Sequence, residues 1–108
     1  MVENVKENVK ENTKENTKDN SVFIGEKPFM NYVTSVVMQF TSKSADDVIV
    51  KARGKFISRA VDVSEVAVKR FLKDQIVVGD IKIDSEDFKN KEGREVRVST
   101  IEIVLKRT

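Results

Sequence analysis

Apolar residues in the first half of the chain recur at two different spacings, and each change of spacing marks a new element. A short apolar run at Val22–Ile24 predicts a strand. After Pro28, which the first turn of a helix tolerates, apolar side chains between residues 29 and 40 recur every three or four positions. Residues 47–53 then alternate apolar and polar positions up to Gly54. The order so far is strand, helix, strand.

The segment from Lys55 to Lys73 carries the clearest helical pattern. Its apolar side chains fall within about half of the helix circumference, and charged side chains fill the other half. A surface helix needs an apolar stripe of only about 100°. We therefore expect this helix to pack on the sheet and also on a second subunit, with a single broad contact to the sheet as the open alternative.

Two long alternating segments end the chain. Residues 75–84 place Val77, Gly79, Ile81 and Ile83 on one face, whereas the apolar parity of residues 96–107 shifts part-way along, which predicts a bulge or a strand buried on both faces. Residues 90–93 have turn chemistry. Strands that reach this turn would be roughly 45 Å long at about 3.3 Å per residue, whereas a compact body of this size is about 30 Å across. The hairpin should therefore project as an arm.

Together these elements predict an α+β fold of order βαβαββ, with two layers, a mixed four-stranded sheet, two helices and a protruding β-hairpin arm. The predicted domain covers residues 21–108. Residues 1–20 instead repeat the motif Glu-Asn-Val/Thr-Lys, which places like charges four residues apart and offers little apolar surface. We expect a solvated, low-complexity charged tail there, with an interaction arm as the alternative.

Composition narrows the chemistry. The chain has 20 basic and 18 acidic residues but neither His nor Cys, so it lacks the commonest general base, the thiolate nucleophile and the usual zinc ligands. The four glycines are too widely spaced for a phosphate-binding loop. Adjacent acids at Asp46-Asp47 and Glu86-Asp87 lie in predicted loops without partner residues. We expect no catalytic residue, no metal and no cofactor.

Location follows from hydropathy. No apolar run approaches the ~18 residues that a membrane span needs, and the chain begins with charged residues rather than an apolar signal peptide. We expect a cytoplasmic protein that does not bind membranes.

The positive charge is local. Residues 51–73 contain seven basic and two acidic side chains, a net charge of +5. Clustered Lys and Arg attract phosphates without reading bases, so this segment predicts nucleic-acid binding, with a merely solvated basic face as the alternative. Most of the six Phe fall at predicted core positions, so we expect little stacking on single strands. The basic candidates are Lys51, Arg53, Lys55, Arg59, Lys69, Arg70 and Lys73, and, on the arm, Lys89, Lys91, Arg94 and Arg97.

Several stretches in residues 21–108 resemble the Alba family of archaeal chromatin proteins. They are Ile24–Val33, the KARGK run at residues 51–55 with its continuation to residue 62, Arg70-Phe71-Leu72, and the RVSTIEI run at residues 97–103. The resemblance implies a homodimer with two hairpin arms that binds double-stranded DNA and RNA with little sequence preference and organises or compacts the chromosome. By position, it places nucleic-acid contacts on Lys27, Lys51, Arg53, Lys55 and Arg94, and a side-by-side contact between dimers on Phe71.

Two departures from the family pattern predict weaker binding. Relatives commonly carry a Lys that is a site of regulatory acetylation at the position where this chain has Glu26. The arm also carries four acidic residues, Glu86, Asp87, Glu92 and Glu95. Like charges that face phosphates oppose binding. The leading hypothesis is thus a chromosome-associated protein that binds DNA and RNA, and the alternative is a protein-interaction module built on the wide apolar face of the second helix.

Overall fold

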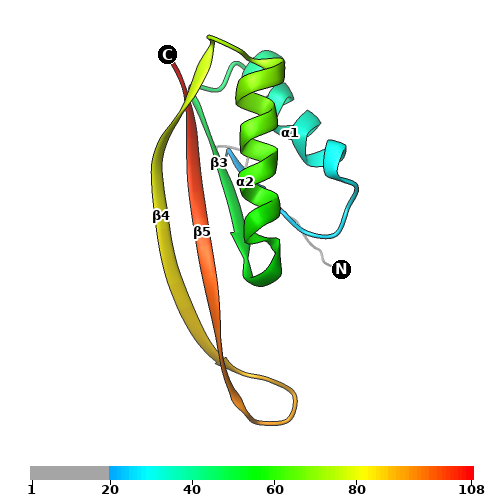
Figure 1. Cartoon of the computed structure of the whole chain (residues 1–108), viewed down its shortest axis with the longest axis vertical. Coiled ribbons are helices and arrows are strands. Elements are labelled where there is room, and N and C mark those ends of the chain that lie inside the picture. Colours follow the sequence, from blue (N-terminus) through cyan, green and yellow to red (C-terminus); the bar gives the residue numbers. More distant parts are fainter. Residues whose placement is uncertain (1–19) are drawn as a thin grey trace, which may run out of the picture.

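A computed structural model describes residues 20–108, which form one α+β layer structure (Figure 1). The order of strands and helices is βαβαββ, as the pattern predicts. Short irregular helical turns flank the second helix on both sides. The elements are β2 (Ser21–Phe23), α1 (Phe29–Thr41), β3 (Asp47–Arg53), η1 (Gly54–Phe56), α2 (Ile57–Val66), η2 (Ala67–Phe71), β4 (Ile76–Lys89) and β5 (Glu95–Arg107).

The four strands form one mixed sheet in the order β2-β3-β5-β4. β2 runs parallel to β3, and β5 runs antiparallel to both of its neighbours. The β3–β5 register is unbroken from Asp47, opposite Lys106, to Arg53, opposite Thr100. Because side chains alternate along each strand, this register decides which residues face the helices.

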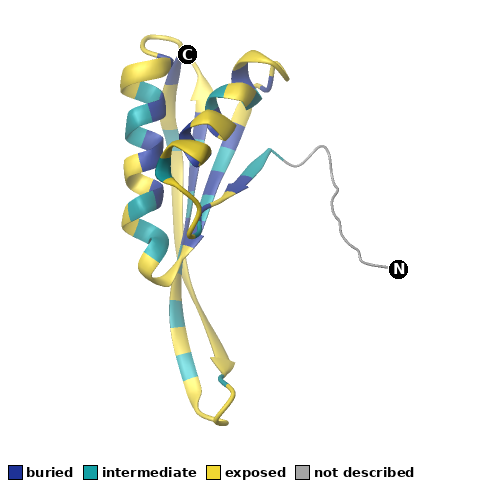
Figure 2. Cartoon of the chain, turned by 90° about the vertical axis from the view of Figure 1, so that its right-hand side faces the viewer, coloured by how far each residue is buried: buried dark blue, intermediate teal, exposed yellow. Residues whose placement is uncertain are grey.

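Both helices cover the same face of the sheet, and the core lies between the two layers (Figures 1 and 2). β3 contributes Val48 and Val50, and β5 contributes Ile103 and Leu105. Opposite them, α1 buries larger side chains, whereas α2 buries small ones, Ala60, Val63 and Ser64, and η2 buries Ala67. These small side chains let the helix backbone approach the sheet. Within residues 20–108, the other face of the sheet carries no helix.

β4 and β5 continue beyond the body as a two-stranded arm, and the described residues span 48 Å along their longest axis (Figure 2). The turn at the tip is closed by Asn90, whose side-chain Oδ1 accepts hydrogen bonds from the backbone N–H groups of Glu92 and Arg94. Gly93 supplies a positive φ of 81° there. The predicted arm is therefore confirmed.

The structure corrects the predicted faces of the hairpin. One extra residue lies in β4, because Val78 pairs with Leu105 whereas Ile81 pairs with Ile103. This bulge places Val78, Ile81 and Ile83 on the helix-bearing face, so the predicted grouping of Val77 with Ile81 and Ile83 is wrong.

Two explanations were predicted for the parity shift in residues 96–107, a bulge or burial on both faces, and the structure favours the second. β5 pairs with β4 without interruption from Glu95 to Ile103. Val96 and Val98 are half-buried on the face opposite Ile101, which explains the parity shift without a bulge. The strand instead changes the face on which it carries apolar side chains.

The second helix differs in detail from the prediction. It begins as η1 and ends as the π-helical turn η2, so the regular α-helix is shorter than residues 55–73. Its wide apolar face is only partly buried: Ile57 and Val68 are half-buried, and Val61 is exposed. The predicted tail, residues 1–20, lies outside the described residues except for its last position. Within residues 20–108, no helix is long and apolar enough to span a membrane.

Candidate nucleic-acid interface

Three predicted basic residues meet where the arm leaves the body. β3 presents Lys51 and Arg53 on the helix-free face, because Val50 and Ala52 between and beside them point into the core. Gly54 then reverses the chain with a φ of 58°, a conformation that disfavours any side chain. The reversal leaves Lys55 exposed on η1, two residues after Arg53. We call Lys51, Arg53 and Lys55 the arm-root cluster.

The loop before α1 is fastened beside this cluster by two side chains. The phenolic oxygen of Tyr32, a residue only 7% exposed, accepts hydrogen bonds of 3.0 Å from the backbone N–H groups of both Gly25 and Lys27. Arg59 donates to the carbonyl of Gly25, and its guanidinium lies 5.6 Å from the Tyr32 ring. Arg59 was predicted as a nucleic-acid contact, and the structure gives it a positioning role in this loop.

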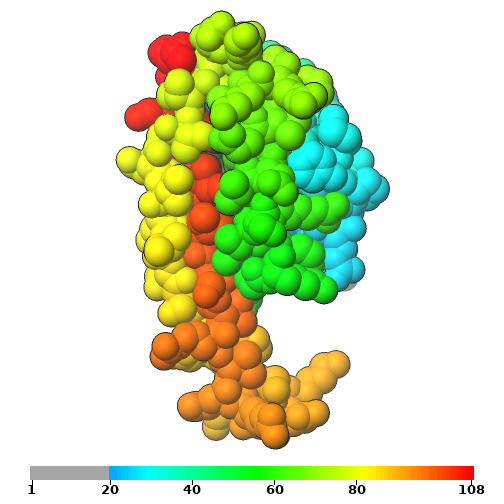
Figure 3. Space-filling model, viewed as in Figure 1, coloured from blue at the N-terminus to red at the C-terminus, as the bar shows by residue number. Residues whose placement is uncertain are grey.

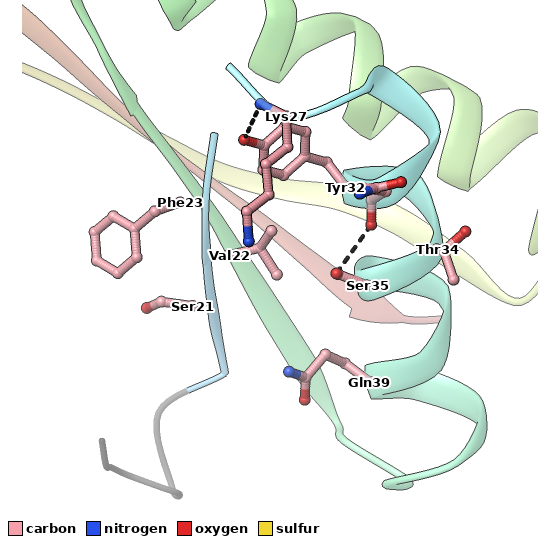
Figure 4. Close-up of a pocket in the computed structure, with 9 residues that line it drawn as sticks. Ser21, Val22, Phe23, Lys27, Tyr32, Thr34, Ser35 and Gln39 are labelled. Atoms are coloured by element: carbon pink, nitrogen blue, oxygen red, sulfur yellow. Dashed lines mark hydrogen bonds between the residues drawn. The ribbon is translucent and has the colours of Figure 1, made fainter. Parts of the chain in front are cut away.

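Lys27 leaves the same loop and extends between β2 and α1 (Figure 4). The open groove there has a volume of about 520 Å³. Its walls are largely polar, with Ser21, Asn31, Thr34, Ser35 and Gln39 among the lining residues. Lys27 is thus on the surface, and the loop that carries it approaches the arm-root cluster at Glu26.

Three of the predicted basic residues form ion pairs with acidic side chains. Arg53 lies 3.4 Å from Glu86, Arg97 lies 3.1 Å from Asp87, and Lys55 lies 4.0 Å from Glu26. Glu86 and Asp87 were expected in a loop, but both lie within β4. All six side chains are more than half exposed, so each pair is weak in water. A phosphate that binds these cations must displace the carboxylates.

The remaining arm residues form a second group. Lys89, Lys91 and Arg94 are exposed around the tip turn, and Arg97 lies between the tip and the body. The structure therefore places the predicted contacts at two levels of one arm. The two levels are joined by exposed β4 and β5 residues (Figure 2).

Other predicted residues lie elsewhere. Phe71 is half exposed in η2, at the end of the second helix that lies farthest from the arm (Figure 1). Lys69 and Arg70 belong to the same turn, and Lys69 forms an ion pair of 2.9 Å with Glu65. The basic face predicted for the second helix is therefore divided, with only Arg59 near the arm.

The expectation that most Phe are buried is wrong. Of the six Phe, only Phe40 lies in the core, whereas Phe23, Phe71 and Phe88 are 67%, 50% and 42% exposed. Phe23 alternates with the buried Val22 and Ile24, so strand alternation alone could have placed it outside. Phe88 was missed because the arm was predicted without assigning its faces.

Acidic groups do not assemble a metal site in the part of the chain that the structure describes. No three Asp or Glu side chains gather closely enough there to hold an ion. Asp46 and Asp47, the other adjacent pair, lie at the beginning of β3.

Comparison with known proteins decides the family. Residues 20–85 match the family model described as Alba. The chain is 59% identical over 85 residues to the DNA/RNA-binding protein Alba of Nanoarchaeum equitans, covering 78% of this chain and 93% of the relative. The chain belongs to the Alba family. It is also 54% identical over 85 residues to DNA/RNA-binding protein Alba 1 of Archaeoglobus fulgidus, covering 79% and 92% of the two chains.

Solved Alba structures share the fold. Alba from Thermoplasma volcanium superposes with a TM-score of 0.73 at 45% identity, over 81% of this chain and 99% of that one. ALBA1 from Trypanosoma brucei gives a TM-score of 0.55 at 27% identity, over 82% and 70%. The Alba family comprises non-enzymatic nucleic-acid-binding proteins, so family membership agrees with the expectation that this chain is not an enzyme.

The clamp by Tyr32 predicts a measurable loss of stability. Tyr32→Phe removes the oxygen that accepts hydrogen bonds from two partly buried backbone N–H groups, so the free energy of unfolding should fall by about 1–3 kcal/mol. Urea denaturation followed by circular dichroism measures this. Thr34→Val, which changes an exposed hydroxyl on the same helix, is the control and should change stability by about 0.5 kcal/mol or less. Equal stability of the Tyr32→Phe variant and the wild type would contradict the clamp.

Proposed function

We propose that this Alba protein binds double-stranded DNA, and also RNA, as a homodimer and with little sequence preference. The observation that carries this proposal is the arm-root cluster, which gathers Lys51, Arg53 and Lys55 on adjoining positions of a rigid strand and turn. The relatives named above, at 54–59% identity, are described as DNA/RNA-binding proteins. The cluster and the relatives support the same ligand by independent routes.

Affinity in this account comes mainly from phosphates. Lys and Arg side chains that neutralise phosphates release condensed counterions, and this contribution does not depend on base sequence. A dimer that brings two arm-root clusters to one duplex neutralises about six phosphates, which predicts a slope of log K against log salt near −5. The carboxylates of Glu86 and Glu26 compete for the same cations, and we expect them to weaken binding.

The arm supplies the second level of contact. A two-stranded ribbon has the width to enter a groove of the duplex, and Lys89, Lys91, Arg94 and Arg97 lie along it. Lys27 extends the basic surface on the other side of the arm root. Glu92 and Glu95 dilute the positive charge of the tip, so phosphate contacts at the root should dominate.

The dimer contact is proposed on the helix-bearing face, beside β4. Ile81 and Ile83 are 57% and 76% exposed although both point toward the same side as the core residues of β5. Val61 of α2 and Val78 of β4 are exposed beside them. Figure 3 shows β4 and α2 on either side of β5 on this face. We propose that a second copy of the chain packs on these exposed apolar side chains, the dimer strip, and buries them symmetrically.

Contacts between dimers are proposed at Phe71. Its half-exposed ring lies in η2, at the end of the second helix farthest from the arm, so it stays accessible when the arm is bound to DNA. Side-by-side binding through Phe71 would organise and compact a chromosome. We propose a chromosome-associated location in the cytoplasm on this basis.

Removal of the root cations tests the phosphate mechanism. Arg53→Ala/Lys55→Ala should weaken binding to every duplex similarly, by roughly 10-fold or more at low salt. Because it removes four cations from each dimer, the salt slope should become shallower by about 3 to 4. Fluorescence anisotropy with two duplexes of unrelated sequence measures both. Lys43→Ala/Lys106→Ala removes the same charge at the opposite end of the sheet and should have a much smaller effect. A loss confined to one sequence would instead indicate base readout.

Disruption of the dimer strip tests the dimer. Ile83→Glu places a charge where the proposed partner packs, so the variant should sediment as a monomer at concentrations at which the wild type is a dimer. The side chain is largely exposed in the single chain, so the fold itself should survive. Met38→Glu, at a 50% exposed position on α1, should remain dimeric. A wild-type chain that sediments as a monomer would contradict the proposal.

A further inference from the structure

The helix-free face of the sheet carries two exposed aromatic rings, each beside a cation. Phe23 of β2 lies opposite Lys51 in register, and the Lys51 ammonium is 5.4 Å from the ring centroid. The guanidinium of Arg53 is 5.6 Å from the ring of Phe88 on the arm. Figure 4 shows the Phe23 ring on the side of β2 away from α1. Neither ring contributes to the core.

A hollow of about 500 Å³ lies beside Phe23, at the point where β2 ends, and is lined by both cations that contact the rings, Lys51 and Arg53. Phe23, Lys51 and Arg53 line it, together with Phe56 at its far side. Thr100, Glu86 and Glu102 add hydroxyl and carboxylate oxygens. This volume and this mixture of aromatic surface with a few polar groups are typical of sites for small planar ligands.

We propose that this face binds single-stranded nucleic acid by stacking unpaired bases on Phe23 and Phe88. The proposal rests on the proposed function, because Lys51 and Arg53 of the arm-root cluster hold the phosphates between the stacked bases. Every base has a π-face, so exposed rings bind single strands without strict sequence preference. In a duplex the bases are already stacked on each other, and the rings gain nothing.

The spacing of the rings suits a strand rather than a single nucleotide. Phe23 is level with Lys51 and hence with Glu102 of β5, whereas Phe88 pairs with Val96. Six positions of β5 therefore separate them, roughly 20 Å at about 3.3 Å per residue. A single strand of several nucleotides spans this distance.

Charge distinguishes this mode from duplex binding. The hollow is lined by two cations, Lys51 and Arg53, and by two carboxylates, Glu86 and Glu102, so phosphate contacts supply a smaller share of the affinity here than at a surface of cations alone. The carboxylates can also accept hydrogen bonds from N–H groups on the edges of unpaired bases, such as the ring N3–H of uracil and thymine. Binding of single strands should therefore depend less steeply on salt than binding of duplexes. The proposed dimer strip lies on the opposite face of the sheet and leaves the rings free.

The test compares a 12-nucleotide oligo-uridine with a 12-base-pair duplex by fluorescence anisotropy on the full chain. Phe23→Leu/Phe88→Leu, which keeps apolar side chains at exposed positions, should weaken oligo-uridine binding by roughly 10- to 100-fold and leave duplex binding within about twofold. Phe23→Tyr/Phe88→Tyr keeps both rings and should retain wild-type affinity. Met38→Leu changes a 50% exposed side chain on α1, outside this face, and should leave both affinities unchanged. Repeating the series with oligo-thymidine separates RNA from DNA as the preferred strand.

Each other outcome overturns the proposal. Oligo-uridine and oligo-thymidine affinities that are unchanged in the Phe23→Leu/Phe88→Leu variant, with duplex binding intact, would contradict stacking while leaving the proposed function standing. A wild type that binds duplex but neither oligonucleotide would likewise contradict stacking and leave the proposed function standing. A wild type that binds neither form in a salt-dependent way would contradict the proposed function itself. Equal thermal unfolding of all variants, followed by circular dichroism, excludes loss of fold as the cause.

Discussion

The pairing of β3 with β5 is the constraint on which the rest of this structure depends. Seven consecutive residues of β3 pair with β5 without a bulge, so the alternation of side chains is fixed over the whole width of the body. Val48, Val50 and Ala52 on one face meet the helices. Lys51 and Arg53 alternate with them and therefore point to the helix-free face. One register thereby produces both the core and the basic cluster.

The same alternation gives the two faces of the sheet different exposed side chains. On the helix-bearing face, α1 and α2 cover β2, β3 and β5 but leave β4 uncovered, so Ile81 and Ile83 remain available to a second chain. On the other face, cations and aromatic rings surround the root of the arm. The proposed protein contacts and the proposed nucleic-acid contacts therefore lie on different faces of the sheet.

Sequence alone predicted the order of elements, the mixed sheet, the arm and the basic segment, because periodicity and charge are local properties that need no knowledge of packing. Strand alternation placed Lys51 and Arg53 on one face correctly, since β3 is regular. Alternation failed in β4, where one extra residue between Val78 and Ile81 changes the face of all that precedes it. Nothing in the local pattern marks that residue.

Interactions between distant segments were likewise beyond the sequence. Arg59 is an exposed cation by helical periodicity, and only the approach of the loop at Gly25 reveals its positioning role. The pairing of Arg53 with Glu86 joins β3 to β4, which are separated by β5. Most Phe were predicted at core positions without a face being assigned to each, and the short strand β2 turns Phe23 outward between the buried Val22 and Ile24.

The most direct test of the account maps the contact surface on the intact protein. Titrating the ¹⁵N-labelled chain with a 12-base-pair duplex and following amide chemical shifts should perturb Lys27, residues 51–55 and the arm from residue 86 to residue 97. Amides of α1 from Thr34 to Thr41 should stay unchanged. Perturbations confined to α1, or to the Ile81–Ile83 edge of β4, would contradict the assignment of the nucleic-acid surface to the arm and its root.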